Sequence, residues 1–360
     1  MKILYDGVYN AKPKSGIHRY FYNIIANMPD DILKYSSTTV SRTDIINHFI
    51  PPFNHFRPHK LSYFIEYAWF LKQNHSINFD LVHSAYYNLS KACLELISNG
   101  VPHIITVHDM IHELFGELDK NEKNQRKKIL RNSKAIIAVS NNTKSDLLNL
   151  YPELDEKKVF VVHHSLSNDS ITKNSQSSQD TNEKFLLYVG HREGYKNFQI
   201  LLPTLKNLNQ TYNMQLFVVG PNPSNAEKKV INEFNINSKI RFLGNVSDDY
   251  LESLYSGCLA FVYPSLYEGF GYPLLESMSK GAIPIASRSS SIPEVLGYAG
   301  IIVKPNCSDS ITGAVLKINQ DMNYENYMRK QSIKRSNEFN IDKNINDTKI
   351  VYEKCLFTKF

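Results

Sequence analysis

Two glutamates, Glu268 and Glu276, stand in the segment of this sequence that is richest in signals for chemistry. An apolar run ends at Pro264, a Gly-Phe-Gly turn follows, and a helix is expected to open near Pro273. Glycines let a backbone approach a ligand closely, and the free N–H groups of a helix N-terminus favour an anion such as a phosphate. A carboxylate beside such a turn is well placed to accept hydrogen bonds from sugar or ribose hydroxyls. An ordinary turn residue and a surface helix residue explain the two glutamates about equally well when each is taken singly.

A second segment places two cations after a glycine. Gly190 follows the apolar run 185–189, and Arg192 and Lys196 come next, before another expected helix. Arginine and lysine neutralise phosphate oxygens, so the pair predicts a site for a diphosphate leaving group. The alternative is a solvated pair of loop cations, and the position after the first strand of a domain favours the functional interpretation.

The amino-terminal half offers three further candidates. Gly16 lies in a turn that leads into a helix, and His108 and Asp109 follow the apolar run 103–107. A glycine at such a turn is often routine, and a histidine at the end of a strand belongs to the core or the surface more often than to a catalytic site. Among the histidines we favour His108, with Asp109 as the second candidate.

Alternating strands and helices must position these residues. Residues 17–28 show the apolar spacing of a helix, and residues 143–150 form another, with Ser140 or Asn141 as its N-cap. Repeated β–α units predict an α/β fold with parallel sheets covered by helices on both faces. The runs that predict strands are 2–5, 81–83, 103–107, 135–139, 159–162, 185–189, 215–219, 240–243, 259–263, 283–286 and 300–303.

A polar segment at 165–184 interrupts this alternation. We therefore expect an amino-terminal Rossmann-like domain at 1–165, a linker at 166–183, and a second Rossmann-like domain at 184–344. Open parallel sheets bind ligands beyond the carboxyl ends of their strands. The site is therefore expected where the two sets of strand ends face each other across a cleft.

Composition narrows the class of protein. The 360 residues are 42% hydrophobic and 21% charged, which is typical of a globular protein with two domains. The net charge of +6 fits an anionic small molecule or membrane, and no nucleic-acid motif accompanies it, so no nucleic-acid partner is expected. The four cysteines are widely spaced, which argues against a zinc site. No apolar run is long enough for a signal peptide or a membrane span, so a cytoplasmic protein is expected.

The segment YPSLYEGFGYPLLESMSKGAIPIAS resembles retaining glycosyltransferase family 4 almost residue for residue, with Glu268 and Glu276 matching its E-x7-E pattern. The resemblance runs from Gly16 to about Pro305. It implies the GT-B fold, which has two Rossmann-like domains facing each other across a cleft, and a last helix, at about 345–360, that crosses back to the first domain. The chain contains no D-x-D triplet, the motif with which glycosyltransferases of the other major fold hold a metal ion. We therefore expect no metal ion and no cofactor beyond the donor.

The resemblance also implies roles for single residues. Glu268 would contact the donor sugar near the reacting carbon, and Glu276 would hold the ribose. His108 would lie against the donor sugar and the acceptor, with Asp109 beside it as a second catalytic candidate. Lys196 aligns cleanly with the family's pyrophosphate lysine, whereas Arg192 would substitute for an arginine that the family usually places beside the glycine or the lysine. Backbone contacts to the donor would come from Gly16, Gly190, Val246, Gly269, Phe270 and Gly271.

The motifs SGIHRYF, TVHDM and VGHREGYKNF look like those of transferases that build bacterial surface polysaccharides. They imply transfer of a hexose, with mannose from GDP-mannose favoured, to a glycan or lipid-linked glycan acceptor. Seven lysines and arginines at 120–134 and the aromatic segment 53–71 fit contact with the inner membrane surface, although a solvated basic helix and an ordinary core segment explain them slightly better. The alternatives are a GT-B nucleotide-sugar epimerase, and a non-catalytic nucleotide-sugar-binding subunit. A phosphorylase would be longer and would need a pyridoxal-phosphate lysine.

Overall fold

The structure, a computed structural model, describes residues 1–7, 16–39, 48–50, 59–74, 76–166, 184–192 and 194–357; at 38, 39, 48–50, 59, 60 and 63 it describes the backbone alone. The chain divides into two compact units: unit 1 is Met1–Ser165 with Ile341–Phe360, and unit 2 is Leu166–Asn340. The linker expected at 166–183 lies outside the described residues apart from Leu166. The carboxyl-terminal segment belongs to unit 1 from Ile341 onward, slightly before the position expected at about 345.

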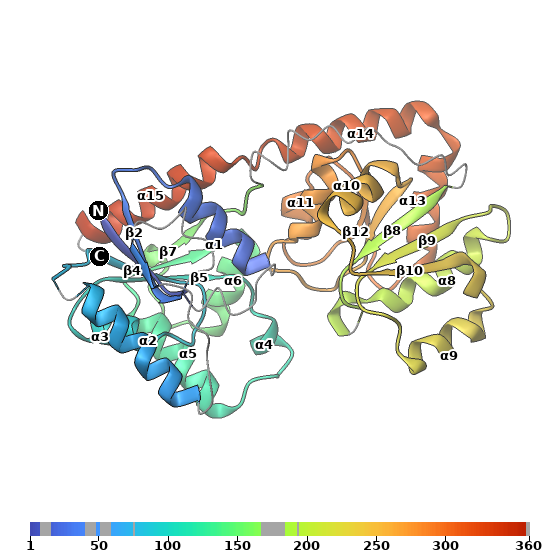
Figure 1. The fold of residues 1–360 in the computed structure, drawn as a ribbon. Helices are drawn as coiled ribbons and strands as arrows, with labels where there is room; N and C mark the ends of the chain where they lie inside the picture. The colour runs from blue at the N-terminus through green and yellow to red at the C-terminus, as the bar shows by residue number, and fades with distance from the viewer. Residues whose placement is uncertain are drawn as a thin grey trace. The chain divides into compact units, whose positions relative to one another are not determined.

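Unit 1 is built on a parallel sheet of seven strands in the order β3-β2-β1-β4-β5-β6-β7 (Figure 1). The central strands are buried along their whole length, as expected of apolar runs covered on both faces. The strands are β1 (Lys2–Tyr5), β2 (Leu33–Thr39), β3 (His48–Ile50), β4 (Leu81–Ser84), β5 (His103–Val107), β6 (Ala135–Ala138) and β7 (Val159–Val161).

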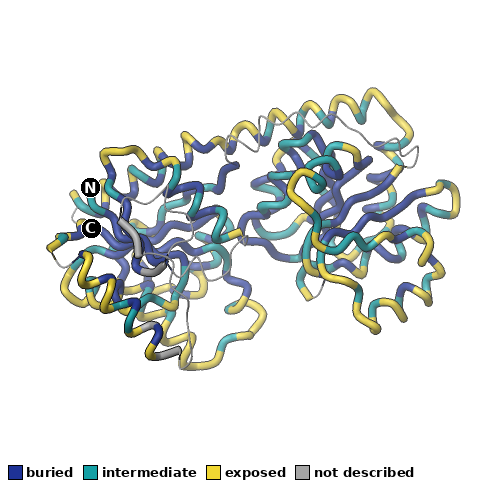
Figure 2. Tube along the Cα trace, viewed as in Figure 1, coloured by how far each residue is buried: buried dark blue, intermediate teal, exposed yellow. Residues whose placement is uncertain are grey.

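Helices cover this sheet, and the burial map shows strands in the interior with solvent-exposed outer helix faces (Figure 2). The helix α1 packs with the carboxyl-terminal α15 over the cluster around Ile3, Phe21 and Tyr352. The helix α6 begins after Ser140, whose side chain accepts from Thr143 N, and this confirms one of the two expected N-caps. The helices are α1 (Gly16–Asn27), α2 (His59–Asn74), α3 (Lys91–Ser98), α4 (Ile111–Leu114), α5 (Lys120–Asn132), α6 (Asn141–Leu150) and α15 (Ile341–Phe357).

Unit 2 repeats the plan with six parallel strands in the order β10-β9-β8-β11-β12-β13. All six strands match apolar runs in the sequence to within one residue at each end. They are β8 (Phe185–Val189), β9 (Gln215–Val219), β10 (Ile240–Gly244), β11 (Ala260–Tyr263), β12 (Pro284–Ser287) and β13 (Ile301–Val303).

The helices of unit 2 enclose one large apolar cluster that includes Leu186, Leu205, Val218 and Ile285. The helix α11 packs against α14, and α8 packs against α13. The helices are α8 (Leu201–Leu208), α9 (Asn225–Phe234), α10 (Asp248–Gly257), α11 (Tyr272–Ser279), α12 (Ile292–Leu296), α13 (Ser308–Gln320) and α14 (Met322–Ser336). Each of the two units therefore has one parallel sheet covered by helices, as the sequence predicts.

The strand β2 was not anticipated because its sequence, LKYSSTT, is largely polar. Lys34, Ser36 and Ser37 of this strand are buried. Ser37 Oγ donates to Asp6 Oδ1 at 2.9 Å, and Lys34 Nζ donates to Met28 O at 3.0 Å. Since a buried polar group is tolerated when it is hydrogen-bonded, these residues fill positions that hydrophobic periodicity assigns to apolar side chains.

Candidate active site

The segment that contains Lys196 and the segment that contains Glu268 lie together at one point of the unit 2 sheet. The chain runs outward from β8 through β9 to β10 and then returns to the other side of β8 with β11. The strand order therefore reverses between β8 and β11, and open α/β sheets bind ligands beyond the carboxyl ends of the strands at such a switch point. Lys196 lies in the loop after β8 and Glu268 in the loop after β11. Sequence positions 72 residues apart thus become neighbours.

Glu268 and Lys196 form an ion pair at this switch point. Lys196 Nζ lies 2.7 Å from Glu268 Oε1, and the two side chains are 21% and 9% exposed. Two buried tyrosines surround the carboxylate, and both have a pKa raised above the ordinary value, first by burial and then by the negative charge of Glu268. These are Tyr188 and Tyr263, of which the Tyr263 hydroxyl is buried without a hydrogen-bond partner. A charge pair in such a place interacts more strongly than it would in water.

Neighbouring loops hold the Glu268 loop in place. Leu266 N donates to Tyr195 O at 2.7 Å, and Asn197 Nδ2 donates to Pro264 O at 3.1 Å. Asn197 has a φ of 54°, a left-handed conformation that asparagine tolerates better than most residues. The ion pair and these two bonds join the loop after β8 to the loop after β11.

The loop after β12 also holds Glu268. From the sequence, Ser290, Ser291 and Glu294 are expected to begin a helix, with serine as the cap and the glutamate at its positive end. Ser290 and Ser291 resemble a helix cap, and α12 does begin there, but Ser291 makes no side-chain cap bond. Both hydroxyls instead donate to the backbone carbonyl of Glu268, at 3.0 and 2.8 Å. The sequence pattern could not reveal this because the partner lies 22 or 23 residues away.

The Gly-Phe-Gly turn leads into α11 as the sequence predicts. Gly271 is the N-cap with a φ of 96°, and Pro273 occupies the first turn, where its missing N–H removes no hydrogen bond. A Cβ on Gly271 would lie 3.5 Å from the Tyr263 ring, an ordinary contact, so it is the backbone conformation that favours glycine. The side chain of Phe270 is buried and packs edge-to-face on Phe339. The backbone of the turn, rather than this side chain, is therefore the candidate for contact with a ligand. Glu276 lies half-buried on α11, and its contact with a ribose stays a prediction.

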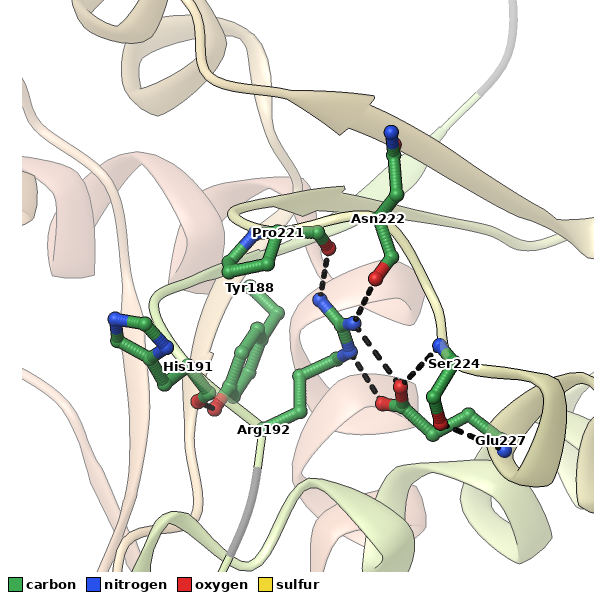
Figure 3. A network of polar contacts seen from close by, with 7 residues as sticks. All are labelled: Tyr188, His191, Arg192, Pro221, Asn222, Ser224 and Glu227. Carbon is green, nitrogen blue, oxygen red and sulfur yellow. Dashed lines mark hydrogen bonds and ion pairs between the residues drawn. The ribbon is translucent and has the colours of Figure 1, made fainter.

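Arg192 has partners other than those that the sequence suggests (Figure 3). Its Nε donates to Glu227 Oε1 at 2.6 Å, Nη1 to Pro221 O at 2.6 Å, and Nη2 to Asn222 O and Glu227 Oε2 at 3.2 Å. Glu227 also completes a capping box with Ser224 at the start of α9. A buried guanidinium with every nitrogen bonded inside the chain is placed to anchor the loop after β8, and its contact with a diphosphate stays a prediction.

Glycines end three neighbouring strands of this sheet. Gly190, Gly220 and Gly244 follow or finish β8, β9 and β10, and all have positive φ values. A Cβ on Gly220 would lie 2.4 Å from Gly190 O, so these two backbones approach too closely for any other residue at position 220. A Cβ on Gly190 or Gly244 would meet no atom within 4 Å. Val246 follows Gly244 and is half-buried, and its contact with a nucleobase stays a prediction.

The remaining candidates belong to unit 1, at the carboxyl ends of β1 and β5. His108 stacks on His164, with ring centroids 5.5 Å apart, and meets the ring of Tyr20 edge-on at 5.1 Å. His108 Nε2 is buried without a hydrogen-bond partner, and burial lowers the pKa of this histidine to about 3. His108 is therefore neutral at physiological pH and has a nitrogen available to a ligand.

The structure gives a local role to Asp109 but none to Gly16, the two other candidates in unit 1. Asp109 Oδ1 accepts from Ile111 N at 3.0 Å and so supports the start of α4. Gly16 is the first residue of α1, and a Cβ there would meet no atom within 4 Å. Packing therefore does not explain a glycine at position 16. Within the described residues, no group of three or more His, Cys, Asp or Glu side chains is arranged to hold a metal ion.

Unit 1 also contains a buried polar network that the sequence did not reveal. His83 Nδ1 lies 2.7 Å from the hydroxyl of Tyr352, and its Nε2 lies 2.9 Å from Thr106 Oγ1. His103 lies between the hydroxyls of Ser84 and Ser133. The network links α15 to the centre of the sheet, because Tyr352 belongs to α15 and His83 to β4.

This network makes the stability of unit 1 sensitive to acid. Burial lowers the pKa of His83 to about 3, of His103 to about 4 and of His108 to about 3. Since these histidines titrate near 6.5 when unfolded, the unfolded chain binds more protons below that pH, and stability falls as the pH drops from 6.5 toward 4. We expect a loss on the order of 1 kcal/mol per histidine for each pH unit. Thermal unfolding from pH 7.5 to 5 measures it. Because burial also lowers the pKa of His164, His103→Asn should flatten the slope by about a quarter. A melting temperature that does not change over this range would contradict the assignment.

Comparisons with known proteins agree with the fold. Residues 16–167 match the family described as Glycosyltransferase Family 4, and residues 169–335 match Glycosyl transferases group 1. An O-antigen chain mannosyltransferase B of Escherichia coli is 29% identical over 221 residues, which is 58% of this chain and 58% of that protein. The chain thus matches little more than half the length of this curated relative.

Two other comparisons extend over nearly the whole chain. An uncharacterized glycosyltransferase of Methanocaldococcus jannaschii is 27% identical over 367 residues, covering 98% of both chains. The crystal structure of Anabaena HepE in complex with UDP and glucose superposes with a TM-score of 0.78 at 15% identity, covering 98% of this chain and 100% of that one. Together the two family matches cover most of the chain, which therefore belongs to the glycosyltransferases that they describe. Its two parallel sheets make up the GT-B fold.

Proposed function

We propose that this protein is a retaining, metal-independent hexosyltransferase that moves a sugar from a nucleoside diphosphate to a hydroxyl acceptor. The observation that carries this proposal is the ion pair between Glu268 and Lys196 at the switch point of the unit 2 sheet. It sets a sugar-binding carboxylate beside a cation suited to a leaving diphosphate. In the reaction, the bond from the anomeric carbon to phosphate breaks, a bond to the acceptor oxygen forms, and the acceptor proton passes to the departing phosphate.

Each residue takes one part of this reaction. Lys196 and the amides at the start of α11 stabilise the charge of the departing diphosphate. Glu268 accepts hydrogen bonds from the donor sugar, and Glu276 accepts them from the ribose. His108, neutral at physiological pH, offers Nε2 to the sugar or the acceptor. We assign Arg192 an anchoring part, because its guanidinium is bonded within the chain.

For the donor we propose GDP-mannose. The support is the likeness to curated O-antigen mannosyltransferases, which cover 58% and 53% of this chain at 29% and 26% identity. The test is a panel of nucleotide sugars incubated with the full chain and an acceptor, with released nucleotide and new glycoside both measured. Mannoside formed from GDP-mannose supports the proposal. An epimerised nucleotide sugar would favour an epimerase, and binding without turnover of any donor would favour a non-catalytic subunit.

For the acceptor we propose a lipid-linked glycan at an anionic membrane surface. The helix α5 is exposed apart from a few residues, and only Leu130 is buried on it. Arg126 and Lys127 pair with acids, whereas the other basic residues of α5 are exposed, and Leu114 and Phe115, which precede α5 in the chain, are exposed too. A basic helix beside exposed apolar side chains suits the surface of an anionic bilayer. Among the described residues, no helix has both the length and the apolar character needed to cross a membrane.

Charge reversal on α5 tests this surface. We expect the double variant Lys123→Glu/Lys128→Glu to bind phosphatidylglycerol vesicles at least about tenfold more weakly than the parent chain, because each surface lysine contributes about 1 kcal/mol. Lys228→Glu/Lys229→Glu on the exposed face of α9 is the matched control with the same change in charge. Vesicle cosedimentation at several salt concentrations measures both. If the two double variants bound the vesicles equally well, α5 would not be the membrane-binding surface.

A further inference from the structure

Glu268 is held at two separate places. Its carboxylate pairs with Lys196, while its backbone N–H and C=O are bonded to the loop that follows β12. The second set of contacts does not touch the reacting groups and has no part in the proposed chemistry. It determines where the Cα of Glu268 lies, and therefore where the carboxylate can reach.

Two serine hydroxyls supply these backbone contacts. Ser290 Oγ accepts from Glu268 N at 2.8 Å and donates to Glu268 O at 3.0 Å, and Ser291 Oγ donates to the same carbonyl at 2.8 Å. The carbonyl therefore receives two hydroxyl donors at once. Three hydrogen bonds to the two peptide groups that flank the Cα of Glu268 fix the position and orientation of this residue more firmly than a single bond does.

The two serines lack the partners that their position would ordinarily give them. A serine at the start of a helix normally accepts from a backbone N–H of the first turn, yet Ser291 makes no such bond. Ser290 has a φ of 44°, a left-handed conformation that is rare and unfavourable for serine. Backbone strain of this kind persists only where the surroundings enforce it, and it gathers at functional sites.

We propose that Ser290 and Ser291 are positioning residues that hold Glu268 at the donor sugar. This rests on the proposed function and deepens it by assigning the β12–α12 loop to the same site. A displacement of about 1 Å at a catalytic group can reduce turnover about 100-fold. Removal of these hydroxyls therefore acts on kcat, while the affinity for nucleotide, which depends on other residues, changes little.

The test compares two buried serines whose hydroxyls donate to the backbone carbonyls of different residues. Ser291 and Ser332 are both 0% exposed, both lie in unit 2, and both donate to a backbone carbonyl at 2.8 Å, of Glu268 and Ala299 respectively. We expect Ser291→Ala to lower kcat by about 10- to 100-fold, with the Kd for GDP within about threefold of the parent. Ser332→Ala should lose similar thermal stability and keep kcat. Equal kcat in Ser291→Ala and Ser332→Ala would overturn the proposal.

Variants at Ser290 distinguish the effect of losing the hydroxyl from the effect of the backbone conformation. They also test the proposal if Ser291→Ala does not fold. Ser290→Gly removes the hydroxyl and relieves the strain of the positive φ, whereas Ser290→Ala removes only the hydroxyl. We expect both to lose kcat, and Ser290→Gly to melt at the higher temperature. Full turnover by Ser290→Gly would overturn the positioning role. If the parent chain turned over no nucleotide sugar, the proposed function would fail and this inference with it, whereas an active parent with active serine variants would refute the inference alone.

Discussion

Glu268→Gln should reduce sugar transfer by about 100- to 1,000-fold, which is the usual effect of removing one preorganised polar group at a reacting centre. Glutamine keeps the shape of the side chain and removes its charge. The pair with Lys196 then becomes a buried lysine beside a neutral amide. Transfer is measured as glycoside formed per enzyme per second at saturating donor, and donor affinity is measured separately.

The matched control is Glu252→Gln. Glu252 pairs with Lys280 at 3.0 Å, also in unit 2 and also partly buried, but Glu252 lies on α10 and Lys280 directly follows α11. Both glutamine variants break an ion pair of similar length, so loss of stability alone would affect both. If Glu268→Gln and Glu252→Gln transferred sugar at the same rate, the catalytic assignment of Glu268 would be wrong.

Lys196→Met should weaken both binding and turnover, because it removes the cation that we propose faces the diphosphate. We expect kcat/KM for the donor to fall by about 100-fold or more, since charge-assisted bonds to phosphate are among the strongest polar contacts. Arg192 is unable to replace the lost cation while its guanidinium holds Glu227 and two carbonyls. Competition by free nucleoside diphosphate should weaken in parallel, and inhibition assays measure it.

A conservative variant sharpens this prediction. Lys196→Arg keeps the positive charge and should recover part of kcat/KM, whereas a lysine with a purely structural part would tolerate methionine and arginine about equally. Lys280→Met again provides the control for a broken ion pair elsewhere in unit 2. A Lys196→Met chain with the inhibition constant of the parent would show that the diphosphate binds at another place.

Hydrophobic periodicity predicts most of the scaffold of this protein. The strands of unit 2 follow apolar runs because parallel strands covered on both faces are continuously apolar. The strand β2 is not apolar in this way because its buried serines and lysine have hydrogen-bond partners outside the strand, such as Asp6 and Met28. Side-chain burial of this kind depends on tertiary contacts, which no local pattern contains.

The site was partly predictable for a related reason. A local motif located Glu268, Gly271 and Lys196, because a turn, a helix start and a charge next to them leave a signature in adjacent residues. The partners of Arg192 and the contacts of Ser290 join segments 22 to 35 residues apart. The sequence suggested a phosphate ligand for the first and a helix cap for the second, and neither local pattern contained the partner that the fold supplies.

The central claim is that the donor binds at the loops after β8 and β11, and hydrogen–deuterium exchange of the full chain with and without GDP-mannose tests it most directly. We predict slower exchange in residues 194–200 and 264–275 when the donor is bound, and loss of that protection in Lys196→Met. Donor-dependent protection confined to other segments, or the same protection pattern in Lys196→Met as in the parent, would contradict the account.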